Sequence, residues 1–218
     1  KNKKLPEPVV HIPLTIGAVT MVYNVPGVEL LKLSPDIIVD IYLGNIKNWN
    51  DKRIQDINEK ANLPDLPVTV VFRGNESGTT HLFTEYLSSL SSKWRRKEGV
   101  TAKFKTVKGM SVKSNKDVAD KVAELKGSIS YVEWNYAKKY ELKIAAVKNS
   151  SGYFMFPSID SVTLAVNKRS FESKKLVNSS SKYAYPICGF SYIVVYQGLN
   201  RHTTYENAKG IVHFIKWA

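Results

Sequence analysis

Short apolar runs alternate with segments of helical periodicity along most of the chain. Runs rich in β-branched and aromatic residues, which are typical of strands, occur at 19–23, 68–72, 129–132, 161–166 and 192–196. Apolar residues recur at the spacing of one helical face in segments 34–43, 51–60, 79–97, 114–125, 134–140 and 205–217. Strands that alternate with helices in this way predict an α/β fold.

One junction between a strand and a helix carries more information than the others. The strand-like run at 68–72 leads directly into Arg73-Gly74-Asn75-Glu76-Ser77-Gly78-Thr79-Thr80, and a helical pattern follows at once. Ser77 or Thr79 supplies the start signal that a helix prefers. We therefore expect the Ser77-Gly78-Thr79 amides to point out of a helix N-terminus, where no internal acceptor reaches them.

Such a helix start suits an anion, because the aligned peptide dipoles leave partial positive charge there. Ser77 and Thr79 can add hydroxyl donors, and Gly78 lets the backbone approach a ligand closely. Arg73 offers a planar fork that matches tetrahedral oxyanions. No acid follows Ser77 before Glu85, so the positive end is left free. From this segment alone, an ordinary capped helix beside a solvated arginine explains the pattern equally well.

Two enzyme motifs fit the segment less well. A phosphate-cradling P-loop needs four residues between its glycines and then a lysine, but Gly74 and Gly78 are one residue too close and Thr79 stands in the place of the lysine. A nucleophile elbow needs glycine two residues before Ser77, where the chain has Asn75.

Five sequence blocks in order place the segment in a longer context. They are Ile12-Pro13-Leu14-Thr15-Ile16-Gly17-Ala18-Val19 leading to Tyr23-Asn24-Val25-Pro26-Gly27, Asp40-Ile41-Tyr42-Leu43-Gly44-Asn45-Ile46-Lys47-Asn48-Trp49-Asn50-Asp51, Arg73-x-x-x-Ser77-Gly78-Thr79, Gly127-Ser128-Ile129-Ser130-Tyr131-Val132-Glu133, and Tyr185-Pro186-Ile187 with Tyr192-Ile193-Val194-Val195. Together they resemble the PstS-type phosphate-binding proteins that serve bacterial ABC phosphate importers.

The resemblance implies a fold and a division of the chain. It implies an α/β type II periplasmic-binding-protein fold, present mainly as its second lobe with remnants of the first. Residues 1–17 would be a first-lobe or hinge remnant, 18–184 the second lobe with the anion-binding turn, and 185–218 the return strand and a first-lobe helix. We expect the sequence to be a large fragment, or a lineage variant, without the family's remaining first-lobe segment and tail.

The resemblance also assigns residues to a ligand. Arg73, Ser77, Gly78 and Thr79 would bind phosphate directly. Asn75 departs from the family, which usually has an acid there that braces the arginine from behind. An amide can still accept a hydrogen bond from the arginine, but it leaves one more net positive charge at the site. The family's other contacts, including a carboxylate that accepts the proton of hydrogen phosphate, would lie upstream of Lys1.

The function that follows from the resemblance is binding and not turnover. The protein would capture inorganic phosphate in a periplasmic or other extracytoplasmic compartment and deliver it to the permease subunits of an ABC-type importer. It would act as a monomer without a cofactor. Anchoring to the membrane, for example by a lipid, through a removed or missing N-terminus stays open, as does the choice between phosphate, arsenate and sulfate.

The net charge and one histidine raise two alternative functions. The formal net charge of +13 raises nucleic acid as a partner, but the basic clusters at 1–4, 93–97, 138–139 and 174–175 are scattered and form no interleaved aromatic platform of the kind that single-strand binders use, which favours a solvated surface. His81 lies four residues after Ser77, so a phosphate-ester hydrolase using this pair is a second hypothesis. The four histidines show no metal-binding spacing. A buried thiol is expected at Cys188, and packing roles are expected for Trp49, Trp94, Trp134 and Trp217.

Overall fold

The computed structural model describes residues 7–167 and 175–217, without the side chain of Asn200. The chain divides into a larger unit, residues 17–189, and a smaller unit that combines 1–16 with 190–218. The expected assignment of these regions to lobes stays a prediction. Of the expected basic clusters, 1–4 and Lys174 lie outside the described residues.

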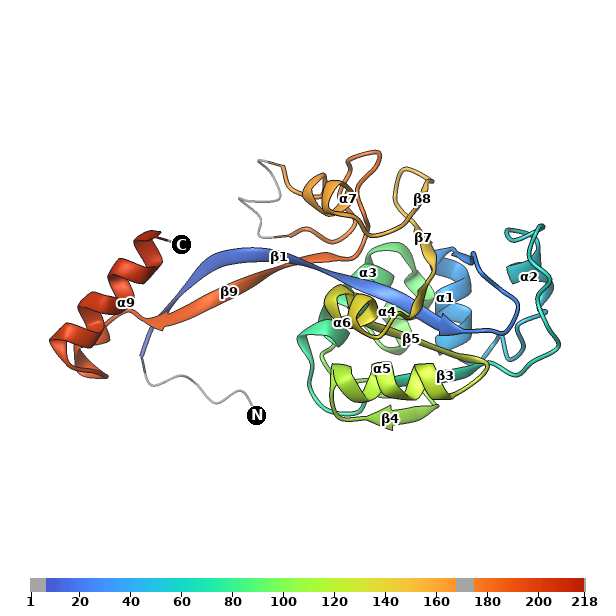
Figure 1. Cartoon of the computed structure of the whole chain (residues 1–218), viewed down its shortest axis with the longest axis horizontal. Coiled ribbons are helices and arrows are strands. Elements are labelled where there is room, and N and C mark those ends of the chain that lie inside the picture. The colour runs from blue at the N-terminus through green and yellow to red at the C-terminus, as the bar shows by residue number, and fades with distance from the viewer. Residues whose placement is uncertain (1–6, 168–174, 218) are drawn as a thin grey trace. The chain divides into compact units, whose positions relative to one another are not determined.

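A mixed sheet forms the centre of the larger unit (Figure 1). Its strands lie in the order β4 (Met110–Val112), β3 (Thr69–Arg73), β5 (Ser128–Glu133), β1 (Val9–Asn24) and β6 (Lys143–Ile144), and β9 (Cys188–Tyr196) also pairs with β1. β3 is parallel to β4 and β5, whereas β1 is antiparallel to β5 and β6. Arg73 lies opposite Val112, so the carboxyl ends of β3 and β4 meet at one edge of the sheet.

Helices cover both faces of this sheet. On one face, Val118 and Val122 of α5 (Asn115–Glu124) form a buried cluster with strand residues that include Val132, and α6 (Trp134–Lys139) joins it through Ala137. The neighbouring Tyr131 points to the opposite face, because side chains alternate along a strand. There its ring stacks on Phe83 of α3 (Gly78–Leu90), with centroids 4.5 Å apart. α1 (Pro35–Tyr42) and α4 (Ser92–Lys97) pack on the same aromatic cluster through Tyr42 and Trp94.

Shorter elements complete the larger unit. A second sheet has the order β2 (Lys32–Leu33), β7 (Ala146–Lys148) and β8 (Phe154–Met155). The helices α2 (Lys52–Gln55) and α7 (Ile159–Thr163) lie in connections between strands.

The smaller unit contains the N-terminal part of β1, most of β9, the 3₁₀ turn η1 (Leu199–Arg201) and α9 (Tyr205–Trp217). No described residue of α9 is buried. Trp217 is 82% exposed, so the packing role expected for it is wrong, whereas Trp49 and Trp94 are fully buried as expected. None of the helices in the described part of the chain combines the length and apolar character that a membrane span needs.

The α/β class and most elements expected from the sequence are confirmed, with three differences. Residues 161–166 are not a strand, because Ser158 and Ser161 form a capping box that starts α7. The helix expected at 51–60 ends at Gln55, and the Asn58 side chain instead bonds to the backbone of Lys32 at 2.7 and 3.0 Å. The helix expected at 79–97 is interrupted at Ser91, whose hydroxyl caps α4 by accepting a bond from Trp94 N.

Candidate anion-binding site

α3 begins with its first amides unoccupied. Ser77 is the N-cap, and its hydroxyl accepts a 3.4 Å bond from Thr80 N. The Ser77 amide is already used, since it donates to Ala102 O at 3.0 Å. Among the described residues, no acceptor pairs with the amides of Gly78 and Thr79, and the first turn contains no acid. The helix start therefore offers two backbone donors and partial positive charge to an anion.

Arg73 ends the strand that leads into this turn and is only partly satisfied. Its Nη1 donates to Asn115 Oδ1 at 3.2 Å, while its Nε is buried without a hydrogen-bond partner in the described structure. A buried donor without a partner costs about 1–3 kcal/mol, and more when it is charged. A ligand that accepts a hydrogen bond from Nε would remove this cost.

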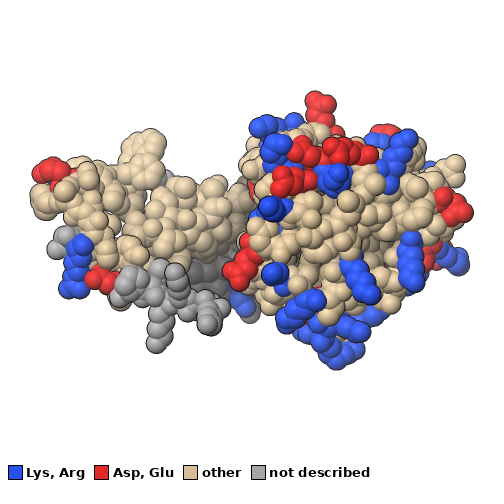
Figure 2. Space-filling model, turned by 90° about the horizontal axis from the view of Figure 1, so that it is seen from below, with Lys and Arg blue, Asp and Glu red and all other residues tan. Residues whose placement is uncertain are grey.

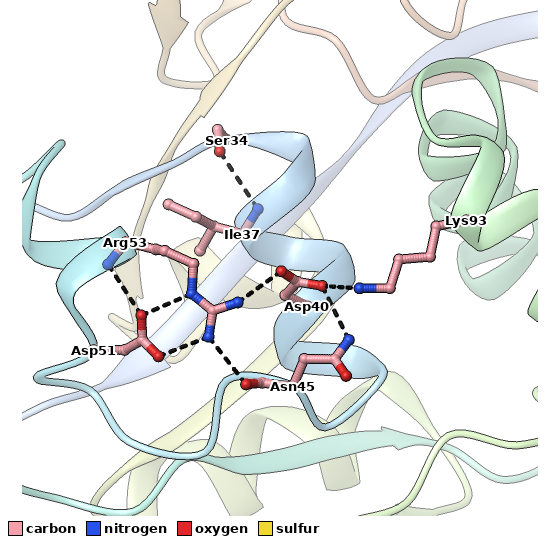
Figure 3. Close-up of polar contacts among 7 residues, drawn as sticks. All are labelled: Ser34, Ile37, Asp40, Asn45, Asp51, Arg53 and Lys93. Carbon is pink, nitrogen blue, oxygen red and sulfur yellow. Dashed lines mark hydrogen bonds and ion pairs between the residues drawn. The ribbon is translucent and has the colours of Figure 1, made fainter.

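A second arginine shows what full pairing looks like (Figure 3). Arg53 donates to both carboxyl oxygens of Asp51 at 2.9 and 2.7 Å, to Asp40 at 2.8 Å and to the carbonyl of Asn45 at 3.0 Å. Lys93 of α4 adds a bond to Asp40 at 2.5 Å. This network joins α1, α2 and α4, and its acids leave Arg53 little capacity for a further anion. Arg73 forms no ion pair with any described residue.

The turn between Arg73 and Ser77 is fixed against the neighbouring strand. Gly74 N donates to Val112 O at 2.9 Å, and a Cβ at Gly74 would collide with Ser111 Oγ. A side chain at this position would require Ser111 to move, whereas the nearest backbone atom, Val112 O, lies at an ordinary contact distance of 3.8 Å. At Gly78, by contrast, nothing lies within 4 Å of an added Cβ, so the space before the helix start is open.

A buried hydroxyl pair lies behind the helix start. Thr80 Oγ1 and Tyr131 Oη are 2.6 Å apart, and both side chains are fully buried. Burial raises the pKa of Tyr131 to about 12, although Thr80 and Arg73 oppose the shift. Tyr131 therefore stays neutral at physiological pH and holds Thr80 in the first turn of α3.

The loop whose Ala102 carbonyl accepts the bond from the Ser77 amide is itself held by hydrogen bonds. The buried carboxylate of Glu98 accepts bonds from the backbone amides of Lys105 at 2.9 Å and Thr106 at 2.6 Å. Thr84 of α3 bonds to Thr101 in the same loop at 2.8 and 2.9 Å. The position of Ser77 is thus set by the loop as well as by its own helix.

Four of the site residues predicted from the sequence lie in one turn, whereas Asn75 forms no hydrogen bond with Arg73 in the described structure. Arg73, Ser77, Gly78 and Thr79 lie around one turn, with Gly78 exposed and Thr79 half-buried. Asn75 is exposed, and no hydrogen bond joins it to Arg73 among the described residues. The partner of Arg73 is Asn115, which sequence reasoning missed because it lies 42 positions away. The signal that could have found it is the Ser114 cap, which places Asn115 at the start of a helix in the neighbouring strand–helix unit.

The other reactive side chains do not form a second site. His81 is exposed and contacts Ser77 only through its backbone amide, which donates to Ser77 O at 3.0 Å; no side-chain bond joins the two within the described ranges. Cys188 is buried as expected, and burial raises the pKa of its thiol to about 12. In residues 7–167 and 175–217, no group of three or more His, Cys, Asp and Glu side chains could hold a metal ion.

Comparison with known proteins gives the family. The model of the PBP superfamily domain matches residues 1–218. The chain is 36% identical over 215 residues to the phosphate-binding protein PstS of Pasteurella multocida, an alignment that covers 95% of this chain and 62% of that protein. It is 35% identical over 228 residues to PstS of Methanocaldococcus jannaschii, covering 95% of this chain and 59% of that protein. The chain therefore spans about three fifths of the length of these curated relatives.

Solved structures show the same fold. A high-affinity periplasmic phosphate-binding protein (PfluDING) bound with phosphate aligns with a TM-score of 0.67 at 21% identity, over 89% of this chain and 60% of that one. An ABC-type phosphate transport receptor from Vibrio cholerae aligns with a TM-score of 0.56 at 17% identity, over 99% of this chain and 70% of that one. The expected type II periplasmic-binding-protein fold is confirmed. On its sequence and its fold, the chain belongs to the PBP superfamily.

Proposed function

We propose that this protein captures inorganic phosphate at the start of α3 and delivers it to the permease subunits of an ABC-type importer. Arg73 contributes its guanidinium, Ser77 and Thr79 contribute hydroxyl groups, and the amides of Gly78 and Thr79 contribute backbone donors. The function is binding, without a cofactor and without catalysis. The place of action is periplasmic or otherwise extracytoplasmic, and the working form is a monomer.

One observation carries the proposal: unused donors lie at both ends of one short turn between β3 and α3. The Gly78 and Thr79 amides and Arg73 Nε all lack acceptors among the described residues, and an added Cβ at Gly78 would meet open space. Each charge-assisted hydrogen bond contributes roughly 1.5–3 kcal/mol, so a few of them can hold a phosphate ion. The relatives that carry the name phosphate-binding protein PstS support this choice of anion.

The proposal includes a division into lobes. Residues 18–184 are the second lobe, 1–17 a remnant of the first lobe or hinge, and 185–218 the return strand with a first-lobe helix. Because the relatives are longer than this chain, their remaining residues would supply the facing half of the cleft. Half of the donors should give weaker binding than a complete cleft.

The alternative functions have less support. The exposed His81 ring and the Ser77 hydroxyl, which accepts from Thr80 N, do not form the activated pair that a hydrolase needs. Lys and Arg side chains lie in several groups on the face shown in Figure 2, with Asp and Glu among them, and do not form one continuous basic stripe. We therefore propose no nucleic-acid partner.

The test is a calorimetric and NMR titration of the 218-residue chain with phosphate. Arg73→Ala should weaken phosphate binding about tenfold to a hundredfold, since each tenfold change equals about 1.4 kcal/mol. Arg53→Ala is the matched control, because that guanidinium is already paired with Asp51 and Asp40. Equal binding by the parent and Arg73→Ala would sink the proposal.

Two further assays separate the alternatives. Turnover of a chromogenic phosphate ester that Ser77→Ala abolishes would identify a hydrolase. Salt-sensitive retention of DNA, without any response to free phosphate, would identify a nucleic-acid-binding module.

A further inference from the structure

Among the described residues, one side chain accepts a hydrogen bond from the Arg73 guanidinium, and that side chain is neutral. Its Nη1 donates to Asn115 Oδ1 at 3.2 Å, and Nε is buried and unpaired within the described ranges. An arginine side chain has several rotatable bonds, so one directed hydrogen bond to a fixed acceptor decides where the free face of the fork points.

The capping box at the start of α5 fixes the backbone that carries Asn115. Ser114 caps the helix by accepting a 3.1 Å bond from Asp117 N, and the Asp117 carboxylate accepts a 2.9 Å bond from Ser114 N. β4 precedes this cap and pairs in parallel with β3, with Val112 opposite Arg73. The two strand ends thus hold Asn115 and Arg73 beside each other.

No acid in the described part of the chain forms an ion pair with the Arg73 guanidinium. Asp117 is engaged with Ser114 N, and the next acid of α5, Asp120, pairs with Lys116 at 2.7 Å. Glu76 in the turn is exposed and forms no ion pair with a described residue. On the β5 side Arg73 interacts with Tyr131, whose hydroxyl is neutral at physiological pH because burial raises its pKa to about 12.

We propose that Asn115 is the positioning residue that aims the Arg73 guanidinium at the ligand without neutralising it, so that the site prefers dianionic over monoanionic tetrahedral oxyanions. The ligand class rests on the proposed function, whereas the positioning role does not. The energetic reason is Coulombic: a ligand with two negative charges gains twice as much as one with a single charge from an uncompensated cation at the same distance.

Two substitutions separate positioning from charge. Asn115→Ala removes the acceptor and leaves the charge of the site unchanged. Asn115→Asp keeps an acceptor of the same shape and adds a negative charge next to Arg73. Asn135→Ala and Asn135→Asp are matched controls, because Asn135 is an exposed asparagine in the first turn of α6.

The first readout needs no ligand. NMR of arginine side chains should show the Arg73 Nη protons of the parent resolved by hindered rotation. Asn115→Ala should merge them by faster rotation, Asn115→Asp should keep them resolved, and the Asn135 variants should match the parent. Unchanged Arg73 signals in a folded Asn115→Ala protein would overturn the positioning role, whether or not phosphate binds.

The second readout is affinity at pH 6 and pH 8 for phosphate, which gains a charge over this range, and for sulfate, which stays a dianion. Relative to sulfate, phosphate should bind the parent more tightly as pH rises. Asn115→Ala should weaken both anions about tenfold. Asn115→Asp should weaken sulfate binding equally at both pH values but phosphate binding more at pH 8.

A ratio of phosphate affinity to sulfate affinity that does not respond to Asn115→Asp would overturn the charge preference. Binding of neither anion, with the Arg73 signals changed as expected, would reject phosphate capture and retain the positioning role.

Discussion

The two helices that follow neighbouring parallel strands, α3 after β3 and α5 after β4, start in the same way and then differ. Both have a serine N-cap whose hydroxyl accepts from the amide three residues on. In α5 the third position is Asp117, which bonds back to Ser114 N. In α3 it is Thr80, which turns inward to Tyr131. The first turn of α5 therefore contains an acid of its own, and the first turn of α3 contains none.

This difference suits the proposed anion site, because a helix start without an acid of its own leaves its dipole and its free amides to a ligand. The capping box of α5 pairs the amides of Ser114 and Asp117, and the Asp117 carboxylate complements the helix dipole within the protein. α3 has no acid in its first turn, so its two free amides and its dipole lack a negative charge, and the nearby Arg73 Nε is also unpaired within the described structure. Because unpaired polar groups cost stability, they are expected where a ligand completes them.

The largest effect on phosphate binding should come from placing an acid in the first turn of α3. Gly78→Asp places a carboxylate where nothing lies within 4 Å of the added Cβ. Phosphate binding should weaken at least about a hundredfold, equal to about 2.8 kcal/mol. The melting temperature should rise slightly, because an acid in the first turn complements the dipole. Titration calorimetry and thermal unfolding measure the two changes. Gly78→Asn is the uncharged control, and retained binding by Gly78→Asp would contradict an anion site at this position.

The second effect concerns the inward-turned Thr80. Tyr131→Phe leaves the Thr80 hydroxyl buried without its partner, which should lower the free energy of unfolding by about 1–3 kcal/mol. Phosphate affinity should also fall, because Thr80 belongs to the first turn. Denaturant unfolding and titration measure both quantities. Tyr185→Phe removes a comparable buried hydroxyl, 3.1 Å from Val19 O. It should cost stability and leave phosphate affinity unchanged; a similar loss of affinity there would mean that Tyr131 acts only through stability.

The third effect compares the two caps directly. Ser77→Ala and Ser114→Ala should each lower the free energy of unfolding by about 1 kcal/mol. The loss should be smaller at Ser77, where the capping bond is 3.4 Å compared with 3.1 Å at Ser114. Only Ser77→Ala should weaken phosphate binding through loss of a ligand hydroxyl. A loss of binding in both variants to the same degree would show that the two starts do not differ in role.

The smallest effect is expected at the saturated arginine network. Burial raises the pKa of Asp40, but hydrogen bonds from Lys93 and Asn45 outweigh the effect of burial, so the pKa lies below the ordinary 3.8. The hydrogen bond from Arg53 likewise lowers the pKa of Asp51. Their stabilisation is therefore complete above the ordinary value and is lost as pH falls through the lowered one. Asp40→Asn should reduce stability at neutral pH by about 0–1 kcal/mol and flatten the loss of stability in acid. Urea unfolding between pH 3 and 7 would show this, and an unaltered pH profile would contradict it.

Local patterns gave most of the fold. The strand at β3, the helix at α5 and its Ser114 cap follow from residue types within a few positions of each other. The elements that failed were decided by side-chain bonds that periodicity does not report. Asn58 bonds to Lys32, 26 positions away, and ends a helical pattern, while Ser91 restarts a helix that the apolar spacing makes continuous.

The candidate site likewise combines local features with one contact between residues far apart in the sequence. The place of Ser77, Gly78 and Thr79 at a helix start could be predicted because a helix start depends on neighbouring residues, whereas their role in binding stays a prediction. The partner of Arg73 could not, because it depends on which strand lies beside β3. Sequence reasoning placed the arginine's brace at Asn75, two positions away, whereas the hydrogen bond goes to Asn115 across the β3–β4 pair. Asn75 stays a prediction as a residue near the ligand.

The most direct measurement is a phosphate titration of the chain followed by amide NMR. The account predicts that the Gly78 and Thr79 amides and Arg73 Nε–H shift together and saturate, while the amides at the start of α5, where Asp117 already supplies a negative charge, stay nearly unchanged. Saturable shifts elsewhere, with none at Gly78, Thr79 and Arg73, would contradict it.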